Sequence, residues 1–274
     1  MSSHSERNDR RKPSAPGRDF SHKPRNKQSF SKGGDDAKDW IWGTHAVEAA
    51  LSNPARPAPK RLLVTADRAK RLAPDIAKLP CVQIMEGKDI ARQLPQGAVH
   101  QGIALKIDEP EPLSIAEIGA PAQGVIVMLD QITDPQNIGA IFRSAAAFGV
   151  RAAILQDRHA PALTGVLAKT AVGAVDKVPY VRVVNLSRAL EELADMGWRA
   201  VGLAGEAEET LENVLDGTPT VLVLGSEGEG VRRLVAEHCD AMGKIAMPGG
   251  FESLNVSAAA AIALYEASRV SRRG

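Results

Sequence analysis

The strongest constraint on the fold of this chain is a regular alternation of short apolar runs and helix-like segments through its second half. Each apolar run is short, as expected for a strand buried on both faces, and each helix-like segment repeats apolar residues at three- and four-residue spacing. The predicted strands are 125–129, 152–155, 178–183, 200–203, 221–224 and 245–247. The predicted helices are 137–148, 162–172, 187–196, 231–238 and 256–270. This order predicts an α/β fold with a parallel sheet covered by helices on both faces.

Residues 40–108 predict a second, smaller α/β domain. Order begins abruptly at Trp40, and Thr44 is the predicted N-cap of a first helix. The predicted strands are 61–65, 82–85 and 102–107, and the predicted helices are 66–78, kinked at Pro74, and 88–94. The Pro- and acid-rich stretch 109–122 predicts an interdomain linker, after which the larger domain occupies residues 123–274.

The first 39 residues differ from the rest in charge and composition. They hold ten Lys and Arg against six Asp and Glu, a balance of +4, whereas the whole chain carries +1, so the remainder carries −3. Ser, Pro, Gly and basic residues dominate, with too few apolar side chains to form a core. We expect a disordered basic arm that contacts an anionic partner, with nucleic acid as one candidate.

Composition excludes several classes of protein. No apolar run approaches the roughly 20 residues of a membrane helix, and the N-terminus lacks the apolar core of a signal peptide. We therefore expect a cytoplasmic protein without membrane contact. The six histidines and the two cysteines, Cys81 and Cys239, show no metal-ligand spacing, which predicts no metal site and two reduced, structural thiols.

Polar residues gather where the first strand of the larger domain leads into a helix. Asn137 stands at the predicted start of that helix, and Arg143 follows nearly two turns later. Two interpretations remain open from the residues alone. Both side chains face a binding site, or Asn137 is only an N-cap and Arg143 only a surface charge.

A second loop, 224–230, is rich in glycine. Its glycines follow a G-x-x-G-x-G order, which matches neither the dinucleotide-binding fingerprint nor the P-loop. Glu227 would repel a phosphate, so its carboxylate better suits a cationic or hydroxyl-bearing ligand. The alternative is that Glu227 is a first-turn acid stabilised by the dipole of the next helix.

A third loop, 253–257, leads into an alanine-rich helix. Ser253 and Asn255 are candidate site residues, and either is also a plausible N-cap of that helix. The alanines at 258–261 predict tight packing of the helix, against the sheet or against a partner subunit.

Taken in order, these three loops resemble the three motifs of the SpoU, or TrmH-like, RNA ribose 2'-O-methyltransferases of the SPOUT superfamily. The matching segments are Asn137-x-Gly139-x-x-x-Arg143, Leu224–Gly230 and Ser253–Ser257. In the smaller domain, Gly43–Val47 and His100–Ile103 resemble the entry and exit signatures of the family's L30e-like substrate-binding domain. The resemblance covers residues 40–107 and about 123–270.

The resemblance implies a trefoil-knotted catalytic domain, S-adenosylmethionine as cofactor, and a homodimer. The implied reaction is methylation of a ribose 2'-hydroxyl in RNA, with a guanosine of 23S rRNA as the expected target. A tRNA 2'-O-methyltransferase and a non-catalytic RNA-binding or assembly factor of the same fold are the alternatives. The glycine order already speaks against a nicotinamide-dependent oxidoreductase.

Residue roles carry over by position. The implied cofactor-binding residues are Leu224, Gly225, Ile245, Met247 and Leu254, and the implied catalytic residues are Asn137, Arg143, Glu227, Ser253 and Asn255. Because an arginine with a pKa above about 12 is a poor base, we interpret Arg143 as a binder of phosphate and of the developing oxyanion. RNA contacts are expected from the basic arm and from Lys60, Arg61, Lys70 and Arg71. Glu252 adds a carboxylate near the third loop.

Overall fold

The computed structural model describes residues 39–249 and 253–271. These described residues all belong to one compact unit, and the description below concerns that unit. The predicted disorder of the arm, apart from Asp39, and the predicted place of Glu252 lie outside the described residues. Among the described residues, no helix is both long and apolar enough to cross a membrane.

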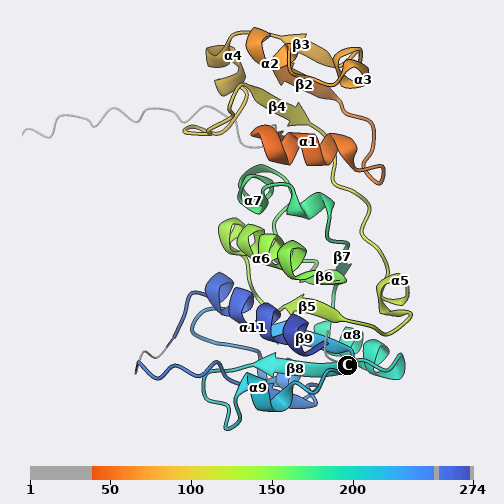
Figure 1. The fold of residues 1–274 in the computed structure, drawn as a ribbon, viewed down its shortest axis with the longest axis vertical. Coiled ribbons are helices and arrows are strands. Elements are labelled where there is room, and N and C mark those ends of the chain that lie inside the picture. Colours follow the sequence, from red (N-terminus) through yellow and green to blue (C-terminus); the bar gives the residue numbers. More distant parts are fainter. Residues whose placement is uncertain (1–38, 250–252, 272–274) are drawn as a thin grey trace, which may run out of the picture. The chain divides into compact units, whose positions relative to one another are not determined.

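The larger sheet has six parallel strands in the order β10-β8-β9-β5-β6-β7. Their bounds are β5 Val125–Leu129, β6 Ala152–Gln156, β7 Tyr180–Val183, β8 Arg199–Leu203, β9 Thr220–Leu224 and β10 Ala241–Gly243. The chain first builds β5, β6 and β7 in one direction, then crosses to β8, and β9 fills the place between β8 and β5 (Figure 1). The predicted parallel α/β sheet is confirmed.

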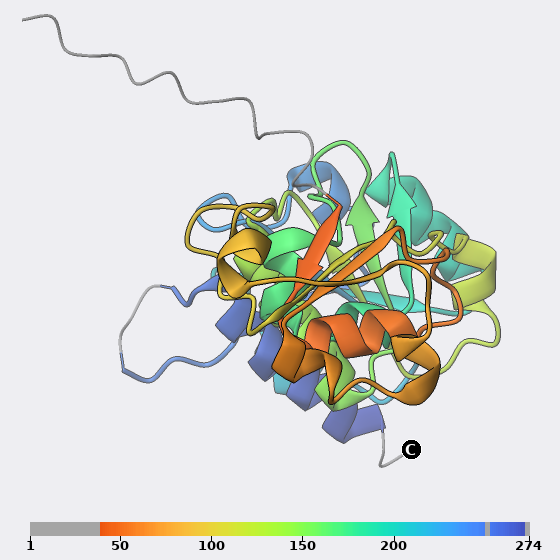
Figure 2. The ribbon, with the colours of Figure 1, turned by 90° about the horizontal axis from the view of Figure 1, so that it is seen from above.

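Helices cover both faces of this sheet (Figures 1 and 2). On one face are α6 Pro135–Phe148, α7 Gly165–Ala171, the short 3-10 helix η1 Ala174–Asp176, α9 Leu211–Val214 and α11 Val256–Ser271. On the other are α5 Ile115–Gly119, α8 Leu186–Asp195 and α10 Arg233–Ala236. Strand β5 shows why both faces are apolar, because Val127 packs into one core cluster and Met128 into the other.

The smaller domain is a four-stranded sheet in the order β1-β4-β2-β3. The strands are β1 Trp40–Trp42, β2 Arg61–Val64, β3 Val82–Ile84 and β4 Ile103–Lys106, and only the β2–β3 pair is parallel. The helices are α1 Thr44–Ser52, α2 Ala66–Ala69, α3 Pro74–Ala77 and α4 Gly87–Ala91. Trp40 and Trp42 are buried in its core, so neither ring is free to stack on a base.

Several predicted boundaries in the first half are wrong for local reasons. The N-cap of α1 is Gly43, in a backbone conformation that favours glycine, rather than Thr44. The predicted helix 66–78 is two short helices, because Pro74 opens α3 at its first position instead of kinking one helix. The linker 109–122 also contains a helix, α5, whose N-terminus is stabilised by a capping box between Ser114 and Glu117.

The last predicted strand, 245–247, is also wrong. The edge strand is β10, which pairs with Val201–Leu203 of β8 through residues 241–243. Ile245 and Met247 follow the sheet edge and line a cavity instead. Apolar side chains are needed equally in a strand and in a cavity wall, so composition alone does not separate the two.

Candidate functional site

A cavity of about 510 Å³ opens beyond the carboxyl ends of β8 and β9, where parallel α/β sheets commonly bind ligands. Three loops form its walls: the one after β8, the glycine-rich loop after β9 and the segment that leads from β10 to α11. The lining residues are Leu203–Glu206, Leu224–Gly230, Ile245, Met247, Ser253–Val256 and Ala259.

The glycine-rich loop turns back on itself so closely that one position admits no side chain. A Cβ added at Gly225 would lie 1.9 Å from the carbonyl carbon of Gly230 and 2.2 Å from the nitrogen of Val231. Gly228 has φ of 91°, a left-handed conformation that L-residues rarely adopt. The glycine order seen in the sequence is therefore explained by the geometry of the loop rather than by phosphate binding.

A buried carboxylate anchors this loop to the sheet. Asp130 directly follows β5 and is fully buried. Its two oxygens accept hydrogen bonds from Arg232 Nε at 2.7 Å and from the Arg232 backbone nitrogen at 2.9 Å. The Asp130 backbone nitrogen donates to the Leu224 carbonyl at 2.8 Å, so both ends of the loop are tied to β5. We did not predict this pair, although a carboxylate directly after a buried strand was the signal available in the sequence.

Three predicted catalytic residues meet beside the cavity. Glu227 Oε1 accepts hydrogen bonds from Asn255 Nδ2 at 2.8 Å, from the Val256 backbone nitrogen at 3.2 Å and from Asn137 Nδ2 at 3.5 Å. Asn255 Nδ2 also lies 3.1 Å from Asn137 Oδ1. These residues come from three loops that are far apart in the sequence, and we call them the Glu227 cluster.

The structure decides between the alternatives for Glu227 and Asn255. Helix α10 begins only at Arg233, so Glu227 is not a first-turn acid of the next helix. Its carboxylate instead contacts the N-terminus of α11, where the helix dipole favours a negative charge. Asn255 precedes α11 and its Oδ1 accepts from the Ser257 nitrogen at 2.9 Å, so it makes a capping contact and belongs to the cluster.

The N-cap alternative for Asn137 is wrong. Helix α6 begins at Pro135, and its N-cap is Asp134, whose carboxylate accepts from the Gln136 nitrogen at 3.0 Å. Asn137 therefore lies within the first turn, half-buried, and its amide is free to reach Glu227 and Asn255.

The other two predicted catalytic residues are not part of the cluster. Ser253 lines the cavity but makes no hydrogen bond to the residues the structure describes. Arg143 is exposed on α6, does not line the cavity, and has no hydrogen bond or ion pair within 39–249 and 253–271. Its role as a phosphate binder stays a prediction.

The five predicted cofactor-binding residues all line the cavity. Leu203, Leu224, Ile245, Met247 and Leu254 give it apolar walls, and the glycines expose backbone groups that can hydrogen-bond to a flat heterocycle. Glu206, Glu227 and Glu229 place carboxylates around it, which suits a ligand with cationic or hydroxyl groups. The chemistry of these walls fits S-adenosylmethionine, which combines an apolar-faced adenine, ribose hydroxyls, an ammonium and a sulfonium.

Metal ligands do not gather in the part of the chain that the structure describes, where no three His, Cys, Asp or Glu residues could hold an ion. Cys81 and Cys239 are unpaired. Burial raises the pKa of the Cys239 thiol to about 12, so this thiol stays protonated at neutral pH.

Two family models match the chain. The model of the SpoU rRNA Methylase family matches residues 124–265, and the model of RNA 2'-O ribose methyltransferase substrate binding matches residues 40–113. Among relatives, the 23S rRNA (guanosine-2'-O-)-methyltransferase RlmB of Yersinia pestis is 37% identical over 237 residues, covering 84% of this chain and 96% of that protein. The RlmB protein of Pseudomonas aeruginosa is 36% identical over 236 residues, covering 84% and 95%.

Solved structures share the fold. The SpoU methyltransferase AviRb of Streptomyces viridochromogenes superposes with a TM-score of 0.72 at 25% identity, covering 86% of this chain and 90% of that one. AviRb in complex with the cofactor AdoMet gives the same TM-score at 24% identity, covering 86% and 91%.

Proposed function

Since this chain belongs to the SpoU rRNA methylase family, we propose that it transfers a methyl group from S-adenosylmethionine to the ribose 2'-hydroxyl of a guanosine in 23S rRNA. The recognition of the family from the three sequence motifs is confirmed. The observation that carries the proposal is the cavity, because all five residues expected to bind the cofactor line it and the Glu227 cluster stands at its side.

The chain's own residues have the task of orientation. The bound cofactor supplies a methyl group already activated by its positively charged sulfur, so the reaction gains most from holding the 2'-oxygen in line with it. The transfer would break the sulfur–methyl bond, form the oxygen–methyl bond and release the hydroxyl proton to solvent water. We assign to Asn137, Glu227 and Asn255 the ordering of the three loops, and to Ser253 a contact at the cavity mouth.

Arg143 has a different proposed task. Its exposed guanidinium is available to bind a phosphate next to the target ribose and to stabilise the negative charge that develops on the 2'-oxygen. Replacing it by lysine keeps the charge and removes the bidentate geometry. Normal turnover and normal RNA affinity of Arg143→Lys would rule out this role.

We propose that the domain 123–274 contains a trefoil knot and that the protein is a homodimer. The crossing from β7 to β8 and the return of α11 from the sheet edge onto α6 support the knot. Exposed Ile262 and Tyr265 on α11, with Phe148 of α6 against the Tyr265 ring, offer an apolar surface for a second copy. A solved structure with segment 244–255 outside the 203–210 loop would contradict the knot. A monomer by sedimentation would contradict the dimer.

We assign RNA binding to residues 40–108, hereafter the RNA-binding module, followed by the linker 109–122. The Arg71 side chain is exposed and makes no hydrogen bond or ion pair with the described residues, so it is the most available of the basic side chains expected to contact phosphate. The other three already have partners. Lys60 pairs with Asp108, Lys70 pairs with Asp67, and the guanidinium of Arg61 lies over the Trp40 ring.

The proposal is tested by transfer of a labelled methyl group to purified RNA. We expect incorporation into 23S rRNA lacking the modification and none into tRNA. Incorporation into tRNA alone would make the protein a tRNA methyltransferase. Binding of 23S rRNA without cofactor binding, measured by calorimetry, would favour the non-catalytic assembly factor.

A further inference from the structure

The RNA-binding module packs on α7 and η1 of the larger domain so closely that the backbones of the two domains nearly touch. Ala168 of α7 belongs to the same apolar cluster as Ile41 of the module. A Cβ on Gly173 would lie 2.7 Å from the Ala49 Cβ and 3.0 Å from the His45 carbonyl oxygen. The small residues at these positions therefore let the module and the larger domain approach closely, and a larger side chain would push the two apart.

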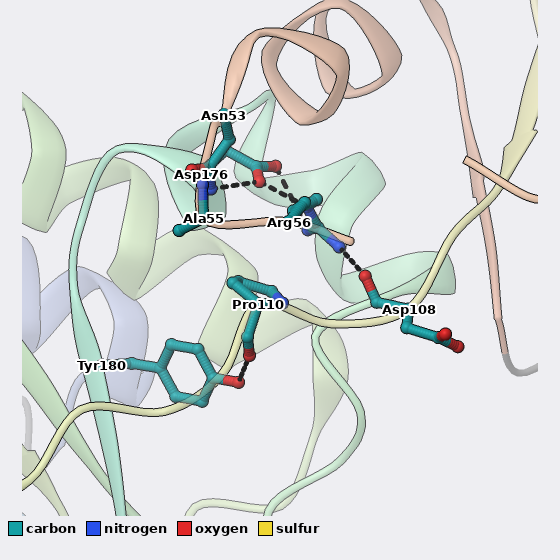
Figure 3. A network of polar contacts seen from close by, with 7 residues as sticks. All are labelled: Asn53, Ala55, Arg56, Asp108, Pro110, Asp176 and Tyr180. Atoms are coloured by element: carbon teal, nitrogen blue, oxygen red, sulfur yellow. Dashed lines mark hydrogen bonds and ion pairs between the residues drawn. The ribbon is translucent and has the colours of Figure 1, made fainter. Parts of the chain in front are cut away.

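A buried ion pair spans this contact (Figure 3). Arg56 Nε and Nη2 donate to the two carboxylate oxygens of Asp176 at 2.5 and 3.2 Å. Asn53 Nδ2 donates to Asp176 at 3.0 Å, and Arg56 Nη1 donates to the Asp108 carbonyl at 2.8 Å. The two charged side chains are only 1% and 3% exposed.

The geometry of this pair allows one placement of the module. The guanidinium fork is planar and rigid, so both hydrogen bonds to Asp176 form only in one relative orientation. Separating the two groups without exposing them to water would leave an unpaired charge in an apolar contact, which is strongly unfavourable. The pair therefore holds the module in a defined position.

The linker adds to this constraint. The Tyr180 hydroxyl donates to the Pro110 carbonyl at 2.5 Å (Figure 3). Arg182 Nη2 donates to Glu109 at 3.2 Å, and the Leu113 nitrogen donates to the Tyr180 carbonyl at 2.9 Å. The start of the linker thus lies along β7. The segment predicted as an interdomain linker is therefore tethered to the larger domain at its start.

Helix α7 connects the module to the helix that carries Asn137 and Arg143. A Cβ on Gly139 of α6 would lie 2.7 Å from the Leu167 carbonyl oxygen and 2.8 Å from the Thr170 Cβ of α7. A displacement of the module relative to α7 therefore changes its distance from α6 and from the cavity beyond.

We propose that Arg56 and Asp176 are positioning residues, which fix the RNA-binding module relative to the methyl-donor cavity and thereby select the one ribose that reaches it. The proposal rests on the proposed function. An RNA held by a fixed module presents one 2'-hydroxyl at reacting distance, whereas a loosely held module brings neighbouring riboses there in turn and each for less time.

The test compares the wild-type protein with Asp176→Asn and with the control Glu237→Gln, which also neutralises a carboxylate but in an exposed ion pair outside the module and the cavity. Calorimetry gives the Kd for S-adenosylmethionine, a steady-state assay on a 23S rRNA transcript gives kcat and KM, and mapping gives the methylated positions. For Asp176→Asn we expect an unchanged cofactor Kd, a kcat at least about tenfold lower, and methylation spread to neighbouring riboses. Glu237→Gln should keep the kcat and the single target position.

A folded Asp176→Asn variant with wild-type kcat and one unchanged target position would overturn the proposal. A second measurement does not depend on that variant folding. Spin labels are placed at the exposed positions Glu48→Cys and Glu192→Cys after Cys81→Ala and Cys239→Ala, leaving the ion pair intact. The labelled protein is mixed with an excess of unlabelled protein, so that only the distance within one chain is measured. We expect one narrow distance, and two or more separate distances would overturn the fixed placement. If the wild type methylates no RNA, the proposed function fails, and the distance measurement still reports on the ion pair.

Discussion

Two carboxylates in this molecule, those of Glu227 and Asp176, are surrounded by amide and charged groups but differ in their access to water. Glu227 is exposed beside the cavity, although it accepts bonds from Asn255 and the Val256 nitrogen. Asp176 is 3% exposed, and both its oxygens are bonded to protein groups. A carboxylate in an exposed cluster can exchange a protein partner for a ligand. A buried ion pair cannot do so without a large cost in free energy, because the exchange leaves an unpaired buried charge. This difference supports the proposals that the first cluster serves binding and that the second holds two parts of the protein together.

The largest expected effect comes from filling the space at the exposed site. In Gly225→Ala the new Cβ collides with the backbone of Gly230, so the loop must move and the cavity changes shape. We expect methyl transfer to fall by more than about 100-fold, because displacements of about 1 Å have such effects on positioned reactants.

Gly205→Ala is the matched control for that change. Gly205 lines the same cavity, but a Cβ there meets no atom within 4 Å. Rates of the two variants within about threefold of each other would show that the tight glycine turn is irrelevant to the donor site.

Asp130 lies next to the cavity but is buried, so its substitution shows whether burial, rather than position near the cavity, decides the effect on stability. Asp130→Asn removes the fully buried charge that pairs with Arg232, whose side chain is 40% exposed. We expect the free energy of unfolding in urea to fall by about 2–3 kcal/mol, below the usual cost for a fully buried pair because water can reach Arg232. Asp134→Asn is the control, since asparagine also serves as an N-cap. Equal stability of both variants would contradict the buried-charge account.

Glu227→Gln tests whether the exposed cluster needs its charge. The substitution keeps an oxygen acceptor and replaces charge-assisted hydrogen bonds by weaker neutral ones. We expect kcat/KM to fall about tenfold with little change in unfolding free energy. Glu237→Gln, at an exposed glutamate that does not line the cavity, should be close to wild type. A large loss of stability in Glu227→Gln would make this cluster a structural one.

The smallest effect concerns the linker and depends on pH. Burial, and then the nearby Glu109 carboxylate, raise the pKa of Tyr180 from 10.0 to about 12. The folded protein thus holds the phenolic proton more tightly than the unfolded chain does. This contribution to stability is fully present below about pH 10 and is lost as the pH rises to about 12. Tyr180→Phe should lower stability by about 1 kcal/mol at pH 7 and remove this alkaline loss. If the unfolding free energies of the wild type and of Tyr180→Phe changed in parallel from pH 9 to pH 12, this account of Tyr180 would be contradicted.

The sequence predicts best what depends on local pattern. The apolar runs predict the parallel sheet because each strand is buried on both faces. The placement of Asn137, Glu227 and Asn255 in one site comes instead from the resemblance of three motifs to a known family. Local pattern does not settle where an apolar segment stops pairing, so Ile245 and Met247 are predicted as a strand although they line the cavity.

Long-range pairs are not accessible to the same reasoning. Arg56 and Asp176 lie 120 positions apart, and Asp130 and Arg232 lie 102 positions apart. Nothing in the residues around each charge specifies its partner. The linker shows the same limit, because its prolines and acids predict an interdomain linker but not its contact with β7.

The most direct test of the methyl-donor site is a map of 2'-O-methylated riboses in rRNA from cells with and without this gene. We predict that one guanosine of 23S rRNA loses its methyl group without the gene. Wild-type protein should restore that methyl group, and Gly225→Ala protein should not. An unchanged set of methylated positions in 23S rRNA would contradict the account.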